Sequence, residues 1–521
     1  MREFKKINLL RSTFNSASTP AAAVPLTSGS LLARNTVWNL IGSGAPMIVA
    51  VFCIPILIRG LGTDRFGVLT LAWALVGYVG LFDLGLGRAL TQLVAKKLGA
   101  GEGEEVPSLA WISLLLMLLL GLTASVLVIL ASPWLVHRLL NIPGPLQLET
   151  LRSFYVLGLS VPVVITTTGL RGLLEAHQRF YLINALRIPM GVFSFAAPLL
   201  VLPFSKSLFP VVAVLVCGRF IAWAAHLLLC FRVIPALRTG MGWRRSNVRH
   251  LLRFGGWMTV TNIVGPLMVT FDRFLIGALV SIAAVAYYAT PYEVITKLWV
   301  IPGALVGVMF PAFSTSSVQN LERTGLLFGR AVKLLFLTLF PVTLLIVVFA
   351  GDGLNLWLGT DFANHSTQIL QWLAAGVFVN SLALVPFTLV QGVGRPDVTA
   401  KLHLLELPIY MLVLWWLVRQ WGIEGAAIAW TGRVIVDASI LFLLAKRFSP
   451  SPASHLRRTF VAIMVALLFL VVGALTNGIV SKVSFLFVAC VIYGVSTWFL
   501  ILSMEERTLV LSYLKQVQVL D

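Results

Sequence analysis

Charged residues are scarce in this chain. Only 11% of its 521 residues are Asp, Glu, Lys or Arg, whereas 58% are hydrophobic. A soluble globular domain carries about 25% charged residues, so this composition excludes an ordinary soluble enzyme and a disordered protein. Acidic residues are scarcer than basic ones, with 20 Asp and Glu against 39 Lys and Arg, so the net charge is +19. In a soluble protein such an excess would indicate a nucleic-acid partner.

Cysteine and catalytic motifs are also lacking. The four cysteines all lie in apolar runs, without a CxxC pair or a histidine at metal-binding spacing. This pattern excludes a disulfide scaffold and predicts no metal site. The sequence contains no phosphate-binding GxxxxGKS/T motif and no HExxH, GxSxG or DxD motif. We therefore expect a protein that is not an enzyme and has no resident cofactor.

Long apolar runs are what the chain does contain. A membrane-spanning helix needs about 20 mostly apolar residues, and the runs here are continuous rather than alternating, which indicates helices and not a barrel. The sequence predicts an all-α polytopic membrane protein with about 14 transmembrane helices. The predicted spans cover residues 35–58, 66–86, 108–131, 150–171, 182–203, 208–231, 255–279, 283–311, 331–350, 366–391, 402–419, 423–445, 459–480 and 483–503.

The basic residues divide unequally between the two sides of the membrane. With alternating spans, 27 of the 39 Lys and Arg fall on one side, seven fall on the other, and five lie within spans. Cytoplasmic loops carry such an excess, so both termini are predicted to be cytoplasmic, with a disordered tail over 1–30 and a second tail over 504–521. The charge then sets topology and contacts anionic headgroups, not nucleic acid. The longest outer loops, 132–149 and 351–365, are too short for a catalytic domain.

The spans repeat along the chain with an offset near 219 residues. The segment LRIP at 186–189 matches LELP at 405–408, and GRFI at 218–221 matches GRVI at 432–435 after a five-residue slip. Because each half contains an even number of spans, the two halves enter the membrane from the same side. They are therefore predicted to be parallel repeats, related by an axis along the membrane normal.

These features predict a simple organisation of the chain. We expect an N-terminal six-helix half over 31–231, a basic cytoplasmic linker over 232–254 and a C-terminal six-helix half over 255–446. Two additional transmembrane helices are expected over 447–503. Two parallel bundles around a central site are typical of an alternating-access transporter, although the architecture does not identify the substrate.

Several charged and polar residues lie inside the predicted spans. A charge near the bilayer centre costs about 2.5–3.5 kcal/mol, so it normally faces a cavity or a partner. Polar side chains recur on spans 1, 2, 7 and 8, which predicts a polar cleft between these four spans with substrate-binding or ion-coupling roles. Asp272 neighbours Arg273 in sequence but points in another direction, so it needs a partner of its own. The residues that predict the cleft are Asn39, Asp83, Asn262, Arg273, Glu293 and Lys297.

Local pairing is the alternative interpretation of these charges. The two charges of span 8 are four residues apart, as are Arg433 and Asp437, and such pairs neutralise each other on a helix. Arg187 and Glu406 occupy equivalent positions of the two halves with opposite charge. We treat these four residues as candidate structural pairs between helices.

Four segments resemble a known family. LLARNTVWNLIGSG, IRGLGTDRFGVLTLAW, GLFDLGLGRAL and VTFDRFLIGAL are similar to Wzx-like polysaccharide flippases, which act on O-antigens and exopolysaccharides, in the multidrug/oligosaccharidyl-lipid/polysaccharide exporter superfamily. The resemblance covers about residues 30–500. It implies a protein of the bacterial cytoplasmic (inner) membrane that moves a polyprenyl-pyrophosphate-linked oligosaccharide to the outer leaflet. It also suggests polysaccharide polymerase machinery as a partner.

The resemblance gives the cleft residues roles. Related flippases use a cationic central cavity, which implies that Arg34, Arg273 and Lys297 bind the pyrophosphate and sugar. The candidate ion-coupling or cavity carboxylates are Asp83, Asp272 and Glu293, and a coupling proton or sodium ion would act through Asp83 or Glu293. The alternative is an ion-coupled multidrug or small-molecule antiporter of the same superfamily, which the lack of a carboxylate in span 1 disfavours. A membrane glycosyltransferase or polymerase is a third hypothesis, disfavoured by the missing DxD motif and the short loops.

Overall fold

The fold is entirely helical in the part of the chain that the structure describes. This computed structural model describes residues 46, 48–79, 83, 86–99, 101–177, 179–238, 267–319, 321–448, 453–502, 504 and 506–508. No strand occurs among these residues. Eight of their helices are long and apolar enough to cross a membrane, and two shorter apolar helices accompany them. The chain is therefore a polytopic helical membrane protein, which confirms the predicted fold class.

The first bundle contains the helices that precede residue 239. Helix α6 packs along both α5 and α8, while α4 lies against α5 and α6. The elements are Ile48–Leu61, α3 (Thr63–Val79), α4 (Leu86–Gly99), the 3-10 turn η2 (Gly103–Glu105), α5 (Val106–Trp134), the π-helical turn η3 (Leu135–Leu139), α6 (Gly144–Ala176), α7 (Phe180–Val201), α8 (Leu208–Val233) and η4 (Pro235–Arg238).

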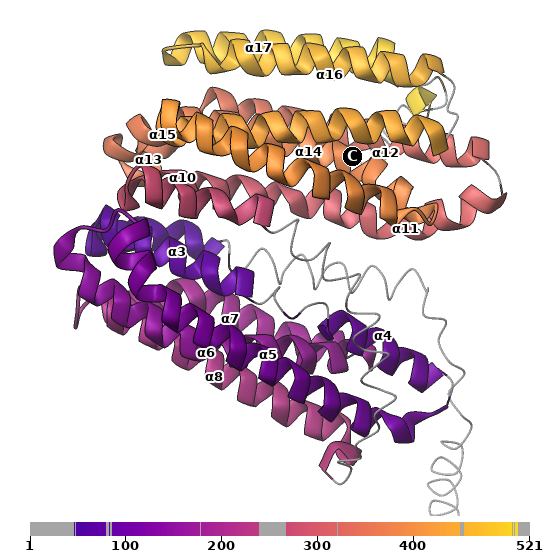
Figure 1. Cartoon of the computed structure of the whole chain (residues 1–521). Coiled ribbons are helices and arrows are strands. Elements are labelled where there is room, and N and C mark those ends of the chain that lie inside the picture. The colour runs from indigo at the N-terminus through magenta and orange to yellow at the C-terminus, as the bar shows by residue number, and fades with distance from the viewer. Residues whose placement is uncertain are drawn as a thin grey trace, which may run out of the picture.

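The second bundle contains the helices that follow residue 266. Helix α14 lies at its centre and contacts α10, α11, α12, α13 and α15. The last two helices, α16 and α17, pack on the outside of this bundle against α12 (Figure 1). The elements are a helix over 267–279, α10 (Ile282–Ile295), η5 (Thr296–Trp299), α11 (Val300–Gln319), α12 (Leu321–Val348), α13 (Ala350–Leu358), α14 (Thr360–Gly392), α15 (Pro396–Phe448), α16 (Ala453–Ala474), α17 (Ile479–Ser496) and η6 (Thr497–Ile501).

Helix α15 is a hairpin of two helices. The backbone leaves the helical region at Trp421 and Gly422, and Gly422 has a φ of 56°, which glycine adopts without a steric penalty. The carbonyl of Leu417 lies against Gly425 across the turn. Further from the turn, side chains of residues 406 and 433 meet, as do those of 403 and 437. These contacts pair the two helices antiparallel and match the separate predicted spans 402–419 and 423–445.

The two segments predicted as outer loops are largely helical. Residues 351–365 form most of α13 and the first turn of α14, separated only by Gly359 with a φ of 92°. Residues 132–149 continue α5 into η3 and already begin α6 at Gly144. The apolar-run criterion missed these segments because they mix polar and apolar residues, yet helix formation does not require an uninterrupted apolar sequence.

The two bundles form two layers that meet along α3 and α10 (Figure 1). Gly67 packs so closely on the carbonyl oxygen of Ile282 that no Cβ would fit. The Asn141 backbone N–H donates to the Gly277 carbonyl at 2.9 Å, and its side-chain amide donates to the Ala278 carbonyl at 2.9 Å. We call this region, residues 67, 141 and 277–282, the closed end. Toward α4 and α11 the layers diverge (Figure 1).

Several predictions lie outside the described residues. These are the tail over 1–30, the linker beyond residue 238, and most of the tail over 504–521. The parallel-repeat relation between the halves, and the side of the membrane on which the termini lie, stay predictions.

Candidate functional site: a polar cavity between the two halves

A cavity of about 390 Å³ lies between the two bundles. The helix Ile48–Leu61, α3, α7 and α8 form one wall, and the helix over 267–279, α10 and η5 form the other. Spans 1, 2, 7 and 8, between which the sequence predicts a polar cleft, therefore all contribute to it. Helices α7 and α8 also line it, which the sequence analysis did not include. The side chains that give the cavity its polar and aromatic character are Thr70, Trp73, Ser194, Arg219, Thr270, Arg273, Tyr292, Glu293 and Trp299.

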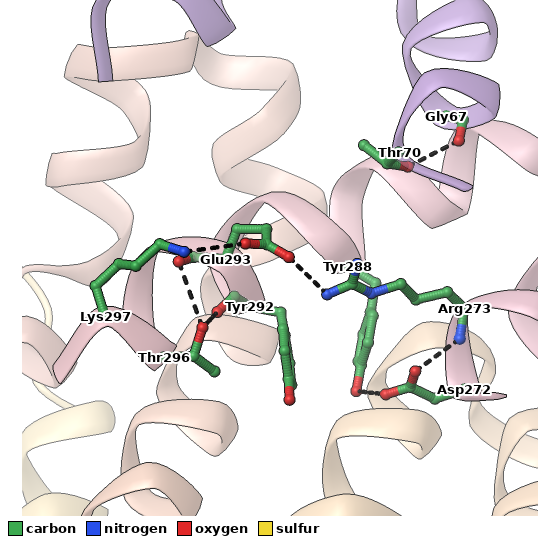
Figure 2. A network of polar contacts seen from close by, with 9 residues as sticks. All are labelled: Gly67, Thr70, Asp272, Arg273, Tyr288, Tyr292, Glu293, Thr296 and Lys297. Carbon is green, nitrogen blue, oxygen red and sulfur yellow. Dashed lines mark hydrogen bonds and ion pairs between the residues drawn. The ribbon is translucent and has the colours of Figure 1, made fainter. Parts of the chain in front are cut away.

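Glu293 connects Arg273, which lines the cavity, to Lys297, which does not. Its Oε1 accepts from Nη2 of Arg273 at 2.9 Å, and its Oε2 accepts from Nζ of Lys297 at 3.3 Å (Figure 2). The Arg273 guanidinium also lies 5.0 Å from the centroid of the Tyr292 ring, a cation–π distance. Arg273 and Lys297 thus share one acid, and of these three residues only Arg273 and Glu293 line the cavity.

Asp272 is held on the other side of Arg273. Its Oδ1 accepts from the backbone N–H of Arg273 at 2.8 Å, and its Oδ2 accepts from the Tyr288 hydroxyl at 2.5 Å (Figure 2). The whole residue is buried, and it does not line the cavity. Its carboxylate therefore ties the helix over 267–279 to α10, with a partner distinct from that of Arg273.

Asp83 also has a structural position. It is buried in the turn before α4, where its Oδ2 accepts from the Gly87 backbone N–H at 3.1 Å and from the Thr168 hydroxyl at 3.1 Å. A carboxylate beside the first N–H groups of a helix is favourable because those groups lack partners within the helix. Asp83 therefore joins the start of α4 to α6. Of the three predicted coupling carboxylates, only Glu293 lines the central cavity.

Arg219 of α8 supplies a charge that the sequence analysis left without a role. It lines the central cavity on the N-terminal wall, and no described carboxylate pairs with it. It also lines a second cavity of about 240 Å³ inside the N-terminal bundle, between α6, α7 and α8. Arg171, Arg187 and His226 face this second cavity too. The placement of Arg219 in the motif GRFI, repeated as GRVI, is the signal that pointed to it.

Three of the other candidate charges meet inside α15, but not in the predicted pair of Arg433 with Asp437. Arg433 lies 3.9 Å from Glu406, and His403 lies 3.6 Å from Asp437. Glu406 thus has Arg433 as its partner, and the suggested pairing of Glu406 with Arg187 is not formed. Ligand atoms of His403, Glu406 and Asp437 lie within 4.8 Å of one another, the one such group found among the described residues. The adjacent guanidinium already supplies a positive charge there, so this donor set does not require a metal.

Three predicted site residues, Arg34, Asn39 and Asn262, lie outside the described residues. Tyr288 was missed by the sequence analysis, because a tyrosine within an apolar span reads as a core residue. Only its partner, the buried charge of Asp272 sixteen positions earlier, gives it a polar role.

Comparison with known proteins identifies the family. Residues 32–317, more than half of the chain, match the model of the family described as polysaccharide biosynthesis protein. The chain is also 32% identical, over 415 residues, to a Shigella flexneri protein named "Putative O-antigen transporter", covering 80% of this chain and 97% of that protein. The chain belongs to this polysaccharide biosynthesis family.

More distant members and neighbours extend the comparison. This chain is 22% identical to a Haloferax volcanii protein named "Probable low-salt glycan biosynthesis flippase Agl15". The match extends over 185 residues, which are 35% of this chain and 39% of that protein. Among solved structures, it resembles an inward-facing multidrug resistance MATE family transporter of the MOP superfamily. That likeness has a TM-score of 0.66 at 16% identity and covers 78% of this chain and 98% of the other. At such identity the likeness shows the fold alone.

Proposed function

We propose that this protein flips a lipid-linked oligosaccharide from the cytoplasmic to the outer leaflet of a bacterial inner membrane, for the synthesis of a surface polysaccharide. The observation that carries the proposal is the cavity between the two bundles, lined by charged, hydroxyl and aromatic side chains in a chain that is otherwise strongly apolar. Family membership and the relative named as an O-antigen transporter support the same substrate class. The polyprenyl pyrophosphate carrier is part of the proposal.

The two halves move relative to each other, so that the cavity is accessible first from one side of the membrane and then from the other. In the predicted orientation the closed end is the outer end, so the cavity opens to the cytoplasm where the lipid-linked sugar is made. The oligosaccharide enters between the halves while the lipid tail stays in the bilayer. Hydroxyl and amide groups of the sugar are bound by Arg273 and Glu293 of the cavity wall, a cation and an acid that together supply both donors and acceptors to a polar ligand.

Glu293 is the candidate for ion coupling. It faces the cavity and bridges two cations, so a proton or sodium ion bound to it would release one of them. The Arg273–Glu293 pair joins the helix over 267–279 to α10, so that release would change the contacts between these two helices. The ion-coupled antiporter of drugs or small molecules is the second candidate, and its structural support is the shared fold of the MATE neighbour.

Complementation tests the assignment of the cavity. The chain is expressed in a bacterium that lacks its O-antigen flippase, and surface polysaccharide is followed on gels and by antibody. Wild type restores export, whereas Arg273→Ala or Lys297→Ala abolishes it, with equal protein in the membrane fraction. Arg152→Ala, at an exposed charge on α6 that does not line the cavity, serves as the control. Normal export from both variants would overturn the assignment, and drug resistance without any glycan export would favour the antiporter.

A further inference from the structure

A groove on the outside of the second bundle stands apart from the central cavity. It has a volume of about 650 Å³ and lies between α12, α16, α17 and η6. None of the described residues that line it also lines the central cavity. Helices α16 and α17 lie on the side of the second bundle that faces away from the first (Figure 1). The groove, which we call the outer groove, is therefore not part of the space between the two halves.

The outer groove has a closed floor and an open rim. Its floor contains buried small and aromatic side chains, namely those of Phe336, Phe340, Ala466 and Ala489. Its rim contains large apolar side chains that are 41–63% exposed, namely those of Val461, Val465, Ile492 and Phe499. The Tyr493 hydroxyl, which also lines the groove, already donates to the Leu337 carbonyl at 2.7 Å. The space is therefore apolar and open to the side of the protein.

Hydrocarbon chains surround the outer groove in a membrane. Its walls belong to apolar helices, of which α12 and the segment Ile479–Phe499 are long enough to span the bilayer. Protein interiors leave few voids larger than a water molecule, and an apolar cavity of about 150 Å³ already binds benzene. A groove of about 650 Å³ that opens to lipid is thus filled by a chain from the bilayer.

The length of the outer groove matches one leaflet. On α17 and η6 its lining runs from Ala489 to Ile501, a rise of about 18 Å at 1.5 Å per residue. One leaflet contributes about 15 Å, half of the hydrocarbon core. An acyl chain that lies along the groove therefore ends with its headgroup at one edge of the bilayer.

Basic side chains lie at one end of the outer groove. Lys333 lies on α12 one turn before the groove, and its Nζ pairs with Glu506. Arg507 donates from Nη2 to the carbonyl of the rim residue Phe499 at 2.9 Å. Arg330 lies one turn before Lys333 and is exposed. These three bases outnumber the single acid among them, and basic sites between membrane helices bind anionic headgroups.

We infer that the outer groove binds an anionic phospholipid of the bilayer, with an acyl chain in the groove and the phosphate at Arg330, Lys333 and Arg507. In the predicted orientation this end is cytoplasmic, so the lipid belongs to the inner leaflet. The chain fills the space between α12 and α17 and so stabilises the packing of the last two helices on the second bundle. This lipid is not the transported molecule, whose tail would leave the central cavity between the bundles.

Native mass spectrometry of the full-length, delipidated protein in mild detergent tests the headgroup site. The protein is titrated separately with dioleoyl phosphatidylglycerol and dioleoyl phosphatidylethanolamine. Wild type is expected to bind one phosphatidylglycerol about tenfold more tightly, because charge-assisted hydrogen bonds favour the anionic lipid. Arg330→Gln and Arg507→Gln each reduce this preference. Arg232→Gln, at an exposed charge near the end of α8 in the first bundle, leaves it unchanged.

The variant Ala462→Trp tests the groove itself. Ala462 lines it on α16, so an indole there takes the space of the acyl chain. Binding of both phospholipids is expected to fall by about tenfold or more, and added phosphatidylglycerol no longer raises the Tm as it does for wild type. Leu468→Trp places the same ring on the exposed face of α16, outside the groove, and keeps wild-type binding. Should Ala462→Trp fail to fold, the exposed Arg330→Gln still decides the proposal.

Three outcomes would overturn the proposal. Wild type that binds phosphatidylglycerol no better than phosphatidylethanolamine has no anionic headgroup site, and a folded Ala462→Trp that binds both lipids like wild type has no chain in the groove. Undecaprenyl phosphate is added as a third probe and is expected to leave bound phosphatidylglycerol in place. Its displacement of that lipid would assign the groove to the carrier. None of these measurements uses export, so the proposed function stands or falls separately.

Discussion

Tyr288 and Tyr292 lie one helical turn apart on α10, yet their hydroxyl groups differ in environment. The Tyr288 hydroxyl donates to the fully buried Asp272 at 2.5 Å, whereas the buried Tyr292 hydroxyl has no partner among the described residues. A hydrogen bond to a buried charge contributes more than a neutral one, and its loss leaves the carboxylate oxygen unsatisfied. The two tyrosines therefore form a matched pair for measuring this contribution.

We expect Tyr288→Phe to lower the free energy of unfolding by about 1.5–3 kcal/mol, because hydrogen bonds to charged groups contribute that much. Thermal unfolding in detergent, followed by tryptophan fluorescence, measures the effect. Tyr292→Phe removes a hydroxyl without a partner and should change stability little or raise it. Equal losses from both variants would show that the Asp272 hydrogen bond is not the cause.

For single residues, the sequence predicts which side chains are charged or polar within the spans better than it predicts their partners. The spacing of Glu293 and Lys297 shows an i,i+4 pair, and the structure contains it. Arg273 and Glu293 are twenty residues apart, and only the packing of two helices brings them together. Helical periodicity gives the face on which a charge lies but not the charge on the facing helix. The sequence pattern therefore predicts a cationic cavity, whereas in the structure Glu293 offsets part of the positive charge.

The contact between α3 and α10 depends on one missing side chain. A Cβ at Gly67 would collide with the backbone carbonyl of Ile282, and backbone cannot move aside as a flexible side chain can. The close approach brings α3 of the first bundle against the start of α10 in the second, beside the central cavity. Small residues at such contacts let membrane helices approach closely.

We expect Gly67→Ala to destabilise the protein by about 1–3 kcal/mol, the usual cost of overpacking, and to reduce export. Gly329→Ala on α12 is the control, since nothing lies within 4 Å of its added Cβ. That change should stabilise the helix by about 0.5–1 kcal/mol through the lower chain entropy of alanine. Thermal unfolding and the complementation assay measure both variants, and a neutral Gly67→Ala would contradict the close contact.

The helices were predictable where one physical property, the length of an apolar run, determines the structure. An apolar run of about 20 residues is stable only within the bilayer, so the helices α5, α6, α12 and α14 are predictable from composition. The predicted span 283–311 is interrupted at η5, where Pro302 has no N–H to donate to residue 298. Helix α13 was missed because it is only nine residues long and carries no long apolar run.

The two bundles are joined at the closed end and by a contact between α13 and the helix Ile48–Leu61. Asn141 bridges to Gly277 and Ala278, and the Trp357 indole donates to the Val51 carbonyl at 2.5 Å. Both contacts join the first bundle to the second. An alternating-access cycle requires that these contacts break when the cavity opens to the opposite side.

We expect the double variant Asn141→Cys/Ala278→Cys to lock the closed end when treated with a short bis-methanethiosulfonate cross-linker. Glycan export should stop after cross-linking and return on reduction, because one of the two conformations becomes inaccessible. Export in cells and a mobility shift on gels give the two readouts. Each single cysteine variant treated in the same way is the control, and continued export from the cross-linked protein would contradict an opening at this end.

The hairpin turn at Trp421 and Gly422 has a consequence for how the protein is made. Two apolar helices joined by so short a turn must enter the bilayer from the ribosome together, as one unit. Each charge at a helix centre costs about 2.5–3.5 kcal/mol when it inserts alone. The turn sets Glu406 opposite Arg433 and His403 opposite Asp437, so each charge enters the translocon beside its counterpart and neither pair needs a helix made earlier or later in the chain.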